Sequence, residues 1–284
     1  MKIPVSVLIP IKNEAANLPR CLAAVAWADE IIVVDSRSTD GSQDIARKAG
    51  AEVVQFEFNG VWPKKKNWAL ENLPFRNEWV FILDADEVLP EGTAEEFADI
   101  VAHDGRGHAG FWINRRFMFM GRWLRHAYYP NWNLRLFKHR LGRYERLVDG
   151  ATNSGDNEVH EHIVVQGTTG RLRSEMDHYA FPSVDVFVEK HNRYSNWEAA
   201  LETQRAGVAG TENGKLQSGA VKLRRRLREW ARRAPFRPTL RFLYVYLAQG
   251  GILDGAAGYY FARLHAVYEL LIVAKVRERK AGNR

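Results

Sequence analysis

Four stretches in the first part of the chain are continuously apolar and rich in valine and isoleucine. They cover residues 5–11, 30–35, 51–56 and 78–84. Stretches that are apolar on successive positions suit the strands of a parallel sheet, because helices cover both faces of such a sheet. The pattern therefore predicts four buried strands.

Segments with helical spacing separate these strands. Leu18, Leu22 and Val25 recur at steps of three and four residues, and residues 42–48 form a short segment that stops at Gly50. Strand and helix in alternation predict an α/β fold with a doubly wound, Rossmann-like sheet.

The pattern changes beyond Gly110. Residues 111–145 are dense in aromatic residues and arginines, and the alternation in NLRLFKHR (133–140) predicts antiparallel strands. Helical spacing resumes near Val184, whereas residues 206–219 are rich in glycine and polar residues, as in a linker. The rest of the chain is expected to form a separate helical region.

Composition narrows the class of protein. The chain has 284 residues, of which 46% are hydrophobic, enough for one large domain or for one domain with an appendage. The single cysteine, Cys21, excludes an intramolecular disulfide framework and a cysteine-rich zinc site, and it indicates a reducing compartment. Residues 1–14 lack a signal-peptide cleavage site and are expected to lead into the first strand.

Positive charge is concentrated towards the C-terminus. The net charge of +7 predicts an anionic partner, either nucleic acid or a membrane surface. In residues 222–242, Leu223, Leu227 and Trp230 share one helical face among arginines, which is typical of a helix in a membrane interface. The apolar stretch 242–262 that follows disfavours nucleic acid, because an RNA-binding tail would not need it.

Residues 242–262 are long enough to span a bilayer. Gln249, Asp254 and the glycines in this stretch argue against spanning, because an aspartate at bilayer depth is expensive. We expect amphipathic helices that dock on the domain or dip into the membrane interface. The alternative is a helical cap over the sheet with a solvated basic face.

Polar side chains follow three of the predicted strands at the point where each strand ends. They are Lys12 and Asn13 beside Pro10 at the end of the first strand, Asp35 at the end of the second, and Asp84 and Asp86 at the end of the fourth. In an open parallel sheet, ligands bind beyond these carboxyl ends. Carboxylates there suit Mg²⁺ or Mn²⁺, which would neutralise a diphosphate leaving group. The alternative for Asp84 and Asp86 is a simple turn before the next helix.

Four motifs carry a family resemblance. PIKNE, VVDSRSTDGS, KKKNWAL and FILDADE resemble, in order and spacing, the motifs of inverting family-2 glycosyltransferases with the GT-A fold. NEVHEH, the sequence DHY at 177–179 and the helical tail are similar to the branch that contains lipopolysaccharide-core glucosyltransferases. The resemblance implies a nucleotide-sugar donor, a divalent metal and transfer by a single displacement.

The resemblance also implies a role for individual residues. Pro10, Lys12 and Asn13 would line the nucleotide pocket, Asp35 would meet the base, Lys66 and Asn67 would lie along the nucleotide, Asp84 would hold the ribose side, and Asp86 would bind the metal. Asp84 and His178 are further candidates for metal ligands, and His178 is alternatively a phosphate contact or a structural histidine.

Inversion at a sugar carbon requires a base on the face opposite the leaving group. Glu161 in VHEH is the candidate base, and the resemblance places the base in the same segment, although many relatives carry a pair of acidic residues there. Asp156 and Glu158 are the alternatives. His160 and His162 are expected to hydrogen-bond to Glu161 or to the donor phosphates.

The predicted function is transfer of a hexose, with UDP-glucose as the family-weighted donor, to a lipid-linked or lipopolysaccharide-type glycan. Residues 1–105 would bind the donor, 106–205 the acceptor within the same catalytic domain, and 220–284 an anionic membrane surface. The enzyme is expected to be cytoplasmic and peripheral on the inner face of the cytoplasmic membrane. The alternatives are a nucleotidyltransferase, for which PIKNEAAN supplies no glycine-rich loop, and a non-catalytic membrane-associated binder of sugar nucleotides.

Overall fold

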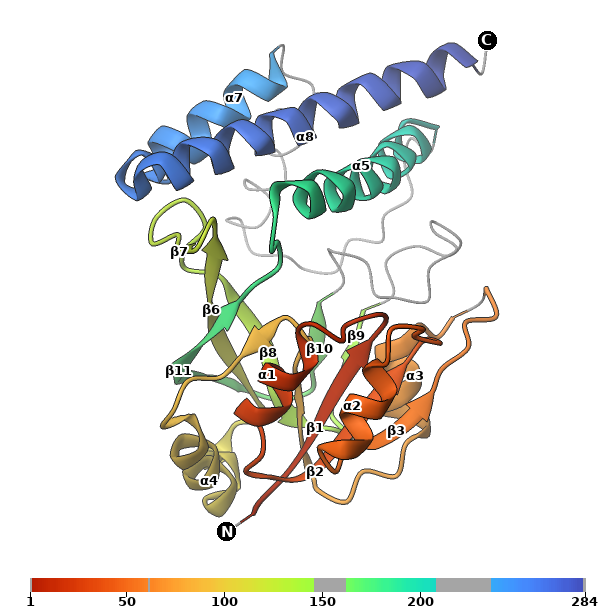
Figure 1. Ribbon diagram of the computed structural model, residues 1–284, viewed down its shortest axis with the longest axis vertical. Helices are drawn as coiled ribbons and strands as arrows, with labels where there is room; N and C mark the ends of the chain where they lie inside the picture. Colours follow the sequence, from red (N-terminus) through yellow and green to blue (C-terminus); the bar gives the residue numbers. More distant parts are fainter. Residues whose placement is uncertain (1, 61, 146–161, 208–235, 283–284) are drawn as a thin grey trace. The chain divides into compact units, whose positions relative to one another are not determined.

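The structure is a computed structural model, and the described residues fall into four segments. They are residues 2–60, 62–145, 162–207 and 236–282. The chain divides into two compact units (Figure 1). The first unit comprises Met1–Met118 and Tyr129–Ala180, and the second comprises Phe119–Tyr128 and Phe181–Arg284.

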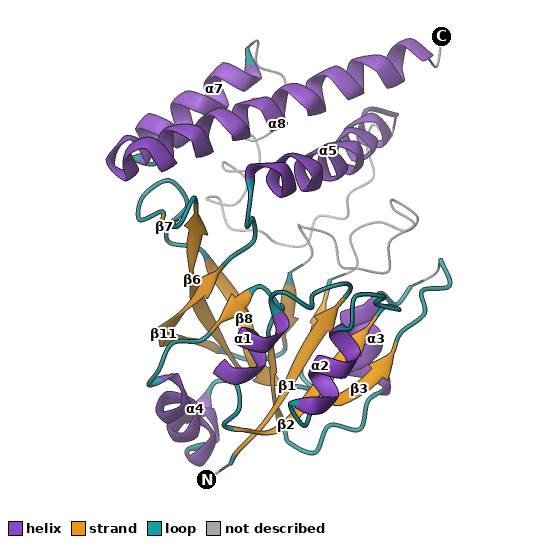
Figure 2. Ribbon diagram, in the orientation of Figure 1, coloured by secondary structure: helices purple, strands orange, loops and turns teal. Residues whose placement is uncertain are grey.

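The first unit is built from a mixed sheet with helices beside it (Figure 2). Its elements in chain order are β1 (Ile3–Ile11), α1 (Leu18–Ala24), β2 (Ala28–Asp35), α2 (Ser42–Lys48), β3 (Glu52–Gln55), α3 (Lys65–Asn72), β4 (Trp79–Ile82), β5 (Glu87–Val88), α4 (Thr93–Ala102), the 3-10 turn η1 (Asp104–Gly107), β6 (Gly110–Phe119), β8 (Trp132–Lys138), β9 (Gly142–Tyr144), β10 (Ile163–Val165) and β11 (Thr169–His178).

The sheet has a parallel half and a mixed half. Its strand order is β3-β2-β1-β4-β8-β6-β11-β5, and β3, β2, β1 and β4 run parallel. Strand β8 is antiparallel to both β4 and β6, β11 is parallel to β6, and β5 is antiparallel to β11. All four predicted strands are therefore present, as β1 to β4, and so is the antiparallel strand predicted in NLRLFKHR, as β8.

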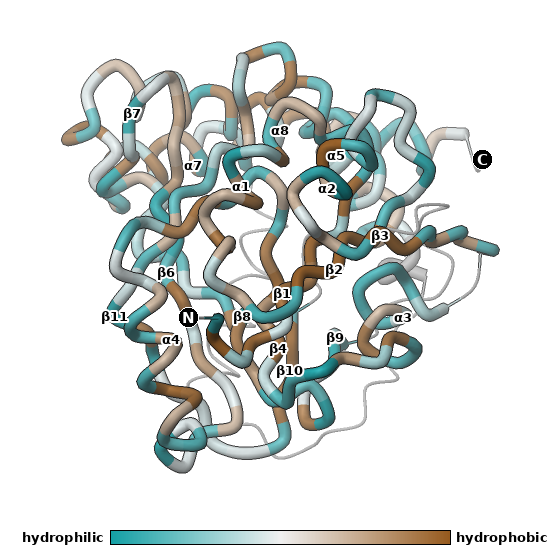
Figure 3. Tube along the Cα trace, turned by 60° about the horizontal axis from the view of Figure 1, so that its bottom comes forward, coloured by the Kyte–Doolittle hydropathy of each residue, from teal (hydrophilic) through white to brown (hydrophobic). Residues whose placement is uncertain are grey.

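Side chains of the parallel strands fill a core on each face of the sheet. On β1, Val7 and Ile9 belong to the cluster that includes Phe97 of α4, whereas Leu8 belongs to the cluster that includes Leu70 of α3. Figure 3 shows β1 and β2 as largely hydrophobic stretches. Burial on both faces explains why these strands lack the polar alternation of a half-exposed strand.

The second unit is helical. It contains the short strand β7 (Arg122–Trp123), α5 (Val184–Gly207), α7 (Arg237–Leu243), the π-helical turn η2 (Tyr244–Ala248), the 3-10 turn η3 (Gly251–Asp254) and α8 (Gly255–Gly282). The stretch 242–262 is thus divided among four elements. No helix in the described part of the chain is long and apolar enough to cross a membrane.

Asp254 belongs to the folded interior of the second unit. Its carboxylate accepts hydrogen bonds from the backbone N–H groups of Arg125, His126 and Ala127 at 2.9, 3.1 and 2.8 Å. Its side chain is only 4% exposed. These hydrogen bonds connect the segment Phe119–Tyr128 to the helices. Asp254 therefore has a structural role within the second unit.

The α/β fold with a C-terminal helical extension is confirmed. Residues 106–205 contribute to both compact units, and the donor-binding, acceptor-binding and membrane roles of the three regions stay predictions. The basic segment 222–235 lies outside the described residues.

Candidate active site

The chain turns back directly after β4, at Asp84-Ala85-Asp86-Glu87. The amide N–H of Glu87 donates to the carbonyl oxygen of Asp84 at 2.9 Å, and the amide N–H of Asp84 donates to Oε2 of Glu87 at 2.9 Å. Glu87 is fully buried. These two hydrogen bonds between Asp84 and Glu87 close the Asp84–Glu87 turn. Asp86 lies between the two residues that they join.

The carboxylate of Asp84 is held by two cations. Lys66 at the start of α3 donates to Oδ1 at 2.8 Å, and Nη2 of Arg135 on β8 donates to Oδ2 at 2.8 Å. Burial alone would raise the pKa of Asp84, but the charges of Arg135 and Lys66 outweigh it and hold this pKa well below its usual value. The carboxylate of Asp84 is therefore ionised, and Lys66 and Arg135 neutralise its charge before any ligand binds.

Asp86 lies beside His178, the last residue of β11. Oδ1 of Asp86 is 3.5 Å from Nε2 of His178, and both side chains are mostly buried. The two meet because β11 pairs with β5, which places His178 opposite Glu87, and because the N–H of Tyr179 donates to the carbonyl oxygen of Asp86 at 2.8 Å. The structure thus brings together two of the three predicted metal ligands.

The pair fits a hard divalent cation. Cis ligands of an octahedral ion with bonds of about 2.1 Å lie about 3 Å apart, so one ion fits between Asp86 and His178 with a small adjustment. Such ions usually take one or two protein ligands and complete their shell with waters and phosphate oxygens. No group of three or more acidic, histidine or cysteine side chains in the described segments is arranged around a metal position. Nδ1 of His178 is buried and has no hydrogen-bond partner among the described residues.

The loops after β1 and β2 are linked to each other. The N–H of Asn13 donates to Oγ of Ser38 at 2.8 Å, and Oδ1 of Asn13 accepts from the N–H of Thr39 at 2.9 Å. Pro10 is half-buried in β1, opposite Val34, whereas Lys12 is exposed. The parallel register therefore brings the predicted nucleotide-pocket residues of these two strands to one edge of the sheet.

Asp35 is fully buried at the end of β2. Its carboxylate accepts hydrogen bonds from the N–H of Ser38 at 3.0 Å, from Nε2 of Gln43 at 2.8 Å and from Nε2 of Gln55 at 3.1 Å. These contacts order the loop after β2. The predicted contact of Asp35 with the nucleotide base would add to these hydrogen bonds, and this role of Asp35 stays a prediction.

Asn67 has a structural partner. Its amide Nδ2 donates to the carbonyl oxygen of Tyr144 at 2.9 Å, and its Oδ1 accepts from the N–H of Tyr144 at 2.9 Å. Asn67 is only 1% exposed, so its amide joins α3 to β9. Lys66, its neighbour in sequence, is the residue of this predicted pair that reaches the Asp84 carboxylate.

The segment that carries the predicted base Glu161 lies outside the described residues, as do Asp156, Glu158 and His160. Its two ends are described. The N–H of Glu145 donates to the carbonyl oxygen of His162 at 2.9 Å, and the N–H of His162 donates to Oε1 of Glu145 at 3.1 Å. Strands β9 and β10 pair beside them, so the segment leaves and returns at one place in the first unit.

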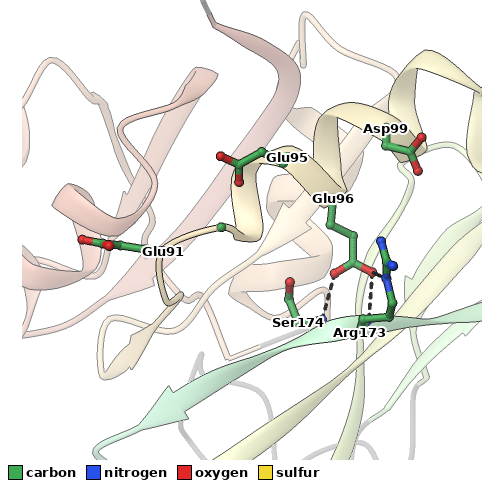
Figure 4. A pocket seen from close by; sticks show the side chains of 7 residues that line it. Glu91, Glu95, Glu96, Asp99, Arg173 and Ser174 are labelled. Carbon is green, nitrogen blue, oxygen red and sulfur yellow. Dashed lines mark hydrogen bonds and ion pairs between the residues drawn. The ribbon is translucent and has the colours of Figure 1, made fainter.

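A surface hollow of about 480 Å³ lies between α4 and β11 (Figure 4). It is lined by Glu91, Gly92, Glu95, Glu96, Asp99, Arg173 and Ser174. Glu96 points to β11, where its carboxylate accepts from the N–H groups of Arg173 and Ser174 at 2.8 Å each. A hollow with this excess of carboxylates repels a diphosphate, so we do not assign it to the donor.

The sequence comparison identifies the family. The profile described as glycosyl transferase family 2 matches residues 6–164. The chain belongs to glycosyltransferase family 2. It is 28% identical to the lipopolysaccharide core biosynthesis glycosyltransferase LpsC of Rhizobium meliloti, over 99% of this chain and 94% of that protein. It is 31% identical to the uncharacterized glycosyltransferase RC0292 of Rickettsia conorii, over 69% of each chain.

Solved structures add weaker likenesses. TarS 1–349 of S. aureus aligns over 98% of this chain and 92% of that chain, with a TM-score of 0.43 and 15% identity. Glucosyl-3-phosphoglycerate synthase from Mycobacterium tuberculosis, crystallised with Mn²⁺, UDP and glucosyl-3-phosphoglycerate, aligns over 76% of this chain and 84% of that chain, with a TM-score of 0.41 and 18% identity. We rest the assignment on the family match and on the sheet. The expected family and its α/β fold are confirmed.

Sequence reasoning predicted Lys66 at the site but missed the two arginines that bind Glu87. Arg135 and Arg115 both bind Glu87, at 2.7 and 3.3 Å. The sequence carries no signal for Arg135, because an arginine between Leu134 and Leu136 in an alternating strand ordinarily faces solvent, and its burial is visible only in the structure. The identity of its acidic partners depends on sheet pairing, which the sequence pattern does not give.

Proposed function

We propose that this family-2 glycosyltransferase moves a hexose with inversion from a nucleoside diphosphate sugar, with UDP-glucose as the expected donor, and that it uses Mg²⁺ or Mn²⁺. The observation that carries the proposal is the pairing of Asp86 with His178, two residues after Asp84, which Lys66 and Arg135 hold. A metal-ligating pair next to buried positive charge suits a metal-bound diphosphate. The whole-chain likeness to LpsC supports a lipopolysaccharide-core or lipid-linked glycan as the acceptor.

Each site residue of the first unit would have its own role in donor binding. Asp86 and His178 would hold the cation, which when bound neutralises charge on the departing diphosphate. Lys12 and Asn13 would line the nucleotide pocket, and Asp35 would meet the base. Asp84, kept ionised by its two cations, can accept a hydrogen bond from a ribose hydroxyl.

Glu161 is the proposed base. It would take the proton from the acceptor hydroxyl while that oxygen attacks the anomeric carbon from the face opposite the diphosphate. The bond between the sugar and the diphosphate breaks in the same step, which inverts the configuration. The described ends of this segment, Glu145 and His162, are held next to Tyr144, which contacts Asn67 beside Lys66.

A thermal-shift screen of UDP, GDP and CDP, each with and without Mn²⁺, tests the donor assignment. We expect one nucleotide to raise the melting temperature only when Mn²⁺ is present, because ligand binding to the folded state stabilises it. The matching sugar nucleotide should then be slowly hydrolysed. The absence of any shift with all three nucleotides, or a shift that Mn²⁺ does not alter, would refute the proposal.

The second unit supplies the proposed membrane contact. Leu240, Leu243 and Leu247 follow one another at three- and four-residue steps along α7 and η2, and they are 43%, 42% and 55% exposed. Leu253 in η3 is 70% exposed. Apolar side chains exposed in series are typical of a helix that lies in a membrane interface. We therefore assign this surface to the anionic inner face of the cytoplasmic membrane.

Charge supports an anionic membrane as the partner. Arg263, Arg277, Arg279 and Lys280 are exposed on α8 of the same unit. Flotation with phosphatidylglycerol and phosphatidylcholine vesicles tests the assignment. The wild-type protein should float with the anionic vesicles, and the double variant Leu247→Glu/Leu253→Glu should not. Val164→Glu, which changes an exposed apolar residue of the first unit, is the matched control. Flotation of the double variant at the wild-type level would refute the contact.

A further inference from the structure

Arg135 is a buried cation in the interior of the sheet. It lies on β8 between β4 and β6, and it is 5% exposed. Its neighbours Leu134 and Leu136 are buried apolar residues. Arginine is rarely buried to this extent unless it is paired, so its ion pairs explain its place in the strand.

A single nitrogen of Arg135 joins the two ends of the Asp84–Glu87 turn. Nη2 donates to Oδ2 of Asp84 at 2.8 Å and to Oε1 of Glu87 at 2.7 Å. The other terminal nitrogen, Nη1, has no hydrogen-bond partner within the described segments. The contact that Arg135 makes is therefore a bridge between two carboxylates, and one nitrogen is enough to make it.

The neighbouring basic residues, Lys66 and Arg115, contact other parts of the site. Lys66 binds Asp84, and Arg115 binds Glu87 and Oδ1 of Asn131. Of these three basic residues, Arg135 is the one that hydrogen-bonds to both Asp84 and Glu87 in the described part of the chain. Asp86 sits between those ends, and its carboxylate must keep its distance of 3.5 Å from His178 for one ion to join them.

We propose that Arg135 is a positioning residue that holds the Asp84–Glu87 turn closed and thereby sets Asp86 against His178 for the divalent cation. This inference rests on the proposed function, because it takes the cation and the nucleoside diphosphate as the ligands of the site. Partners one step removed from a metal typically change metal affinity by roughly 10- to 100-fold when they are replaced. Arg135 lies one step further out, because it contacts Asp84 and Glu87 on either side of Asp86, so we expect an effect at the lower end of this range.

Mn²⁺ binding in the presence of saturating UDP or GDP, whichever the thermal-shift screen selects, tests the proposal. Electron paramagnetic resonance of free Mn²⁺ gives the dissociation constant without an activity assay. Arg135→Met should weaken Mn²⁺ binding by roughly 10-fold. Binding of the nucleotide without metal, measured by calorimetry, should change less, because Lys66 still holds Asp84 on the ribose side. Arg135→Lys should restore part of the Mn²⁺ affinity, because one ammonium nitrogen can donate to both carboxylates.

Two controls separate positioning from a general structural role. Arg173→Met removes an exposed arginine of the same unit and should leave Mn²⁺ affinity unchanged. Circular dichroism reports whether Arg135→Met folds. If it does not fold, Glu87→Gln decides, because it weakens the other anchor of the bridge while Arg135 stays paired with Asp84.

The outcomes are distinct. Wild-type Mn²⁺ affinity in folded Arg135→Met, or in Glu87→Gln where Arg135→Met does not fold, overturns the positioning role. An equal loss of metal-free nucleotide binding in Arg135→Met overturns it too, because the effect would not pass through Asp86. A wild-type protein that binds neither nucleotide with Mn²⁺ instead refutes the proposed function itself, and that result is visible before any variant is made.

Discussion

Oδ1 of Asp86 and Nε2 of His178 lie 3.5 Å apart, although Asp86 follows β4 and His178 ends β11. The antiparallel pairing of β5 with β11 creates this neighbourhood. A strand of only two residues therefore decides which histidine can meet the aspartate that follows the buried strand β4.

Removal of the Asp86 carboxylate tests its role as metal ligand. Asp86→Ala should abolish metal-dependent transfer, with a loss on the order of 100-fold or more, because a bound cation supplies several kcal/mol of charge stabilisation. Transfer rates at saturating donor, compared across Mn²⁺ concentrations, measure the effect. Asp44→Ala, which changes an exposed carboxylate on α2, should have no effect. Full turnover by Asp86→Ala would remove the assigned metal role.

The proposed base gives a different kinetic result. Glu161→Gln should lower the turnover rate by roughly 10²- to 10⁴-fold, the usual contribution of a general base, because an amide cannot accept the proton. Donor affinity should stay near the wild-type value. Glu158→Gln and Asp156→Asn are the matched controls and should retain activity. Near-normal transfer by Glu161→Gln, with a loss in either control, would move the base to that residue.

Asp254 should contribute strongly to the stability of the second unit. Asp254→Ala removes the acceptor for three backbone N–H groups, which we expect to cost on the order of 2–4 kcal/mol of unfolding free energy. Denaturant unfolding, followed by a probe of the helical unit, measures this cost. Glu278→Ala, at an exposed position on α8, should change stability little. An Asp254→Ala protein as stable as wild type would contradict the structural role.

Two buried histidines in the second unit have lowered pKa values. Burial lowers the pKa of His191 to about 4, with the charge of Lys190 acting in the same direction and the hydrogen bond to the carbonyl oxygen of Phe187 opposing it. Burial also lowers the pKa of His265 well below its usual value, and the charges of Arg241 and His191 add to this. Both rings are therefore neutral in the folded protein at neutral pH.

These pKa values predict acid sensitivity. A histidine has a pKa of about 6.5 in the unfolded chain, so the unfolded state takes up protons first as the pH falls. Stability should be complete above about pH 6.5 and should decline towards about pH 4, by on the order of 3 kcal/mol for His191 alone. Unfolding free energies across this range test the prediction. His191→Gln should flatten the decline, and an unchanged slope would contradict it.

Local patterns were sufficient to predict the parallel half of the sheet. The runs 5–11, 30–35 and 78–84 became β1, β2 and β4 because burial on both faces leaves a continuous apolar signal. The same logic predicted that Asp84 and Asp86 lie at the carboxyl edge of the sheet, directly after β4. Polar residues at the ends of parallel strands converge whatever the loops between them do.

Long-range partners could not be predicted in this way. Asp254 was interpreted through the cost of an aspartate at bilayer depth, yet its partners are backbone groups 127 to 129 residues earlier in the chain. Asn67 was expected along the nucleotide, and its amide contacts Tyr144. Neither contact leaves a periodic pattern, because each depends on how distant elements pack.

The central claim is that Asp86 and His178 hold a divalent cation that binds the diphosphate of the donor. Anomalous diffraction at the manganese edge, from crystals grown with Mn²⁺ and the nucleoside diphosphate that the thermal-shift screen selects, tests it most directly. We predict a manganese peak within roughly 2–2.3 Å of an Asp86 carboxylate oxygen and of Nε2 of His178, with phosphate oxygens on the same ion. Nucleotide bound at this edge with manganese elsewhere would contradict the account.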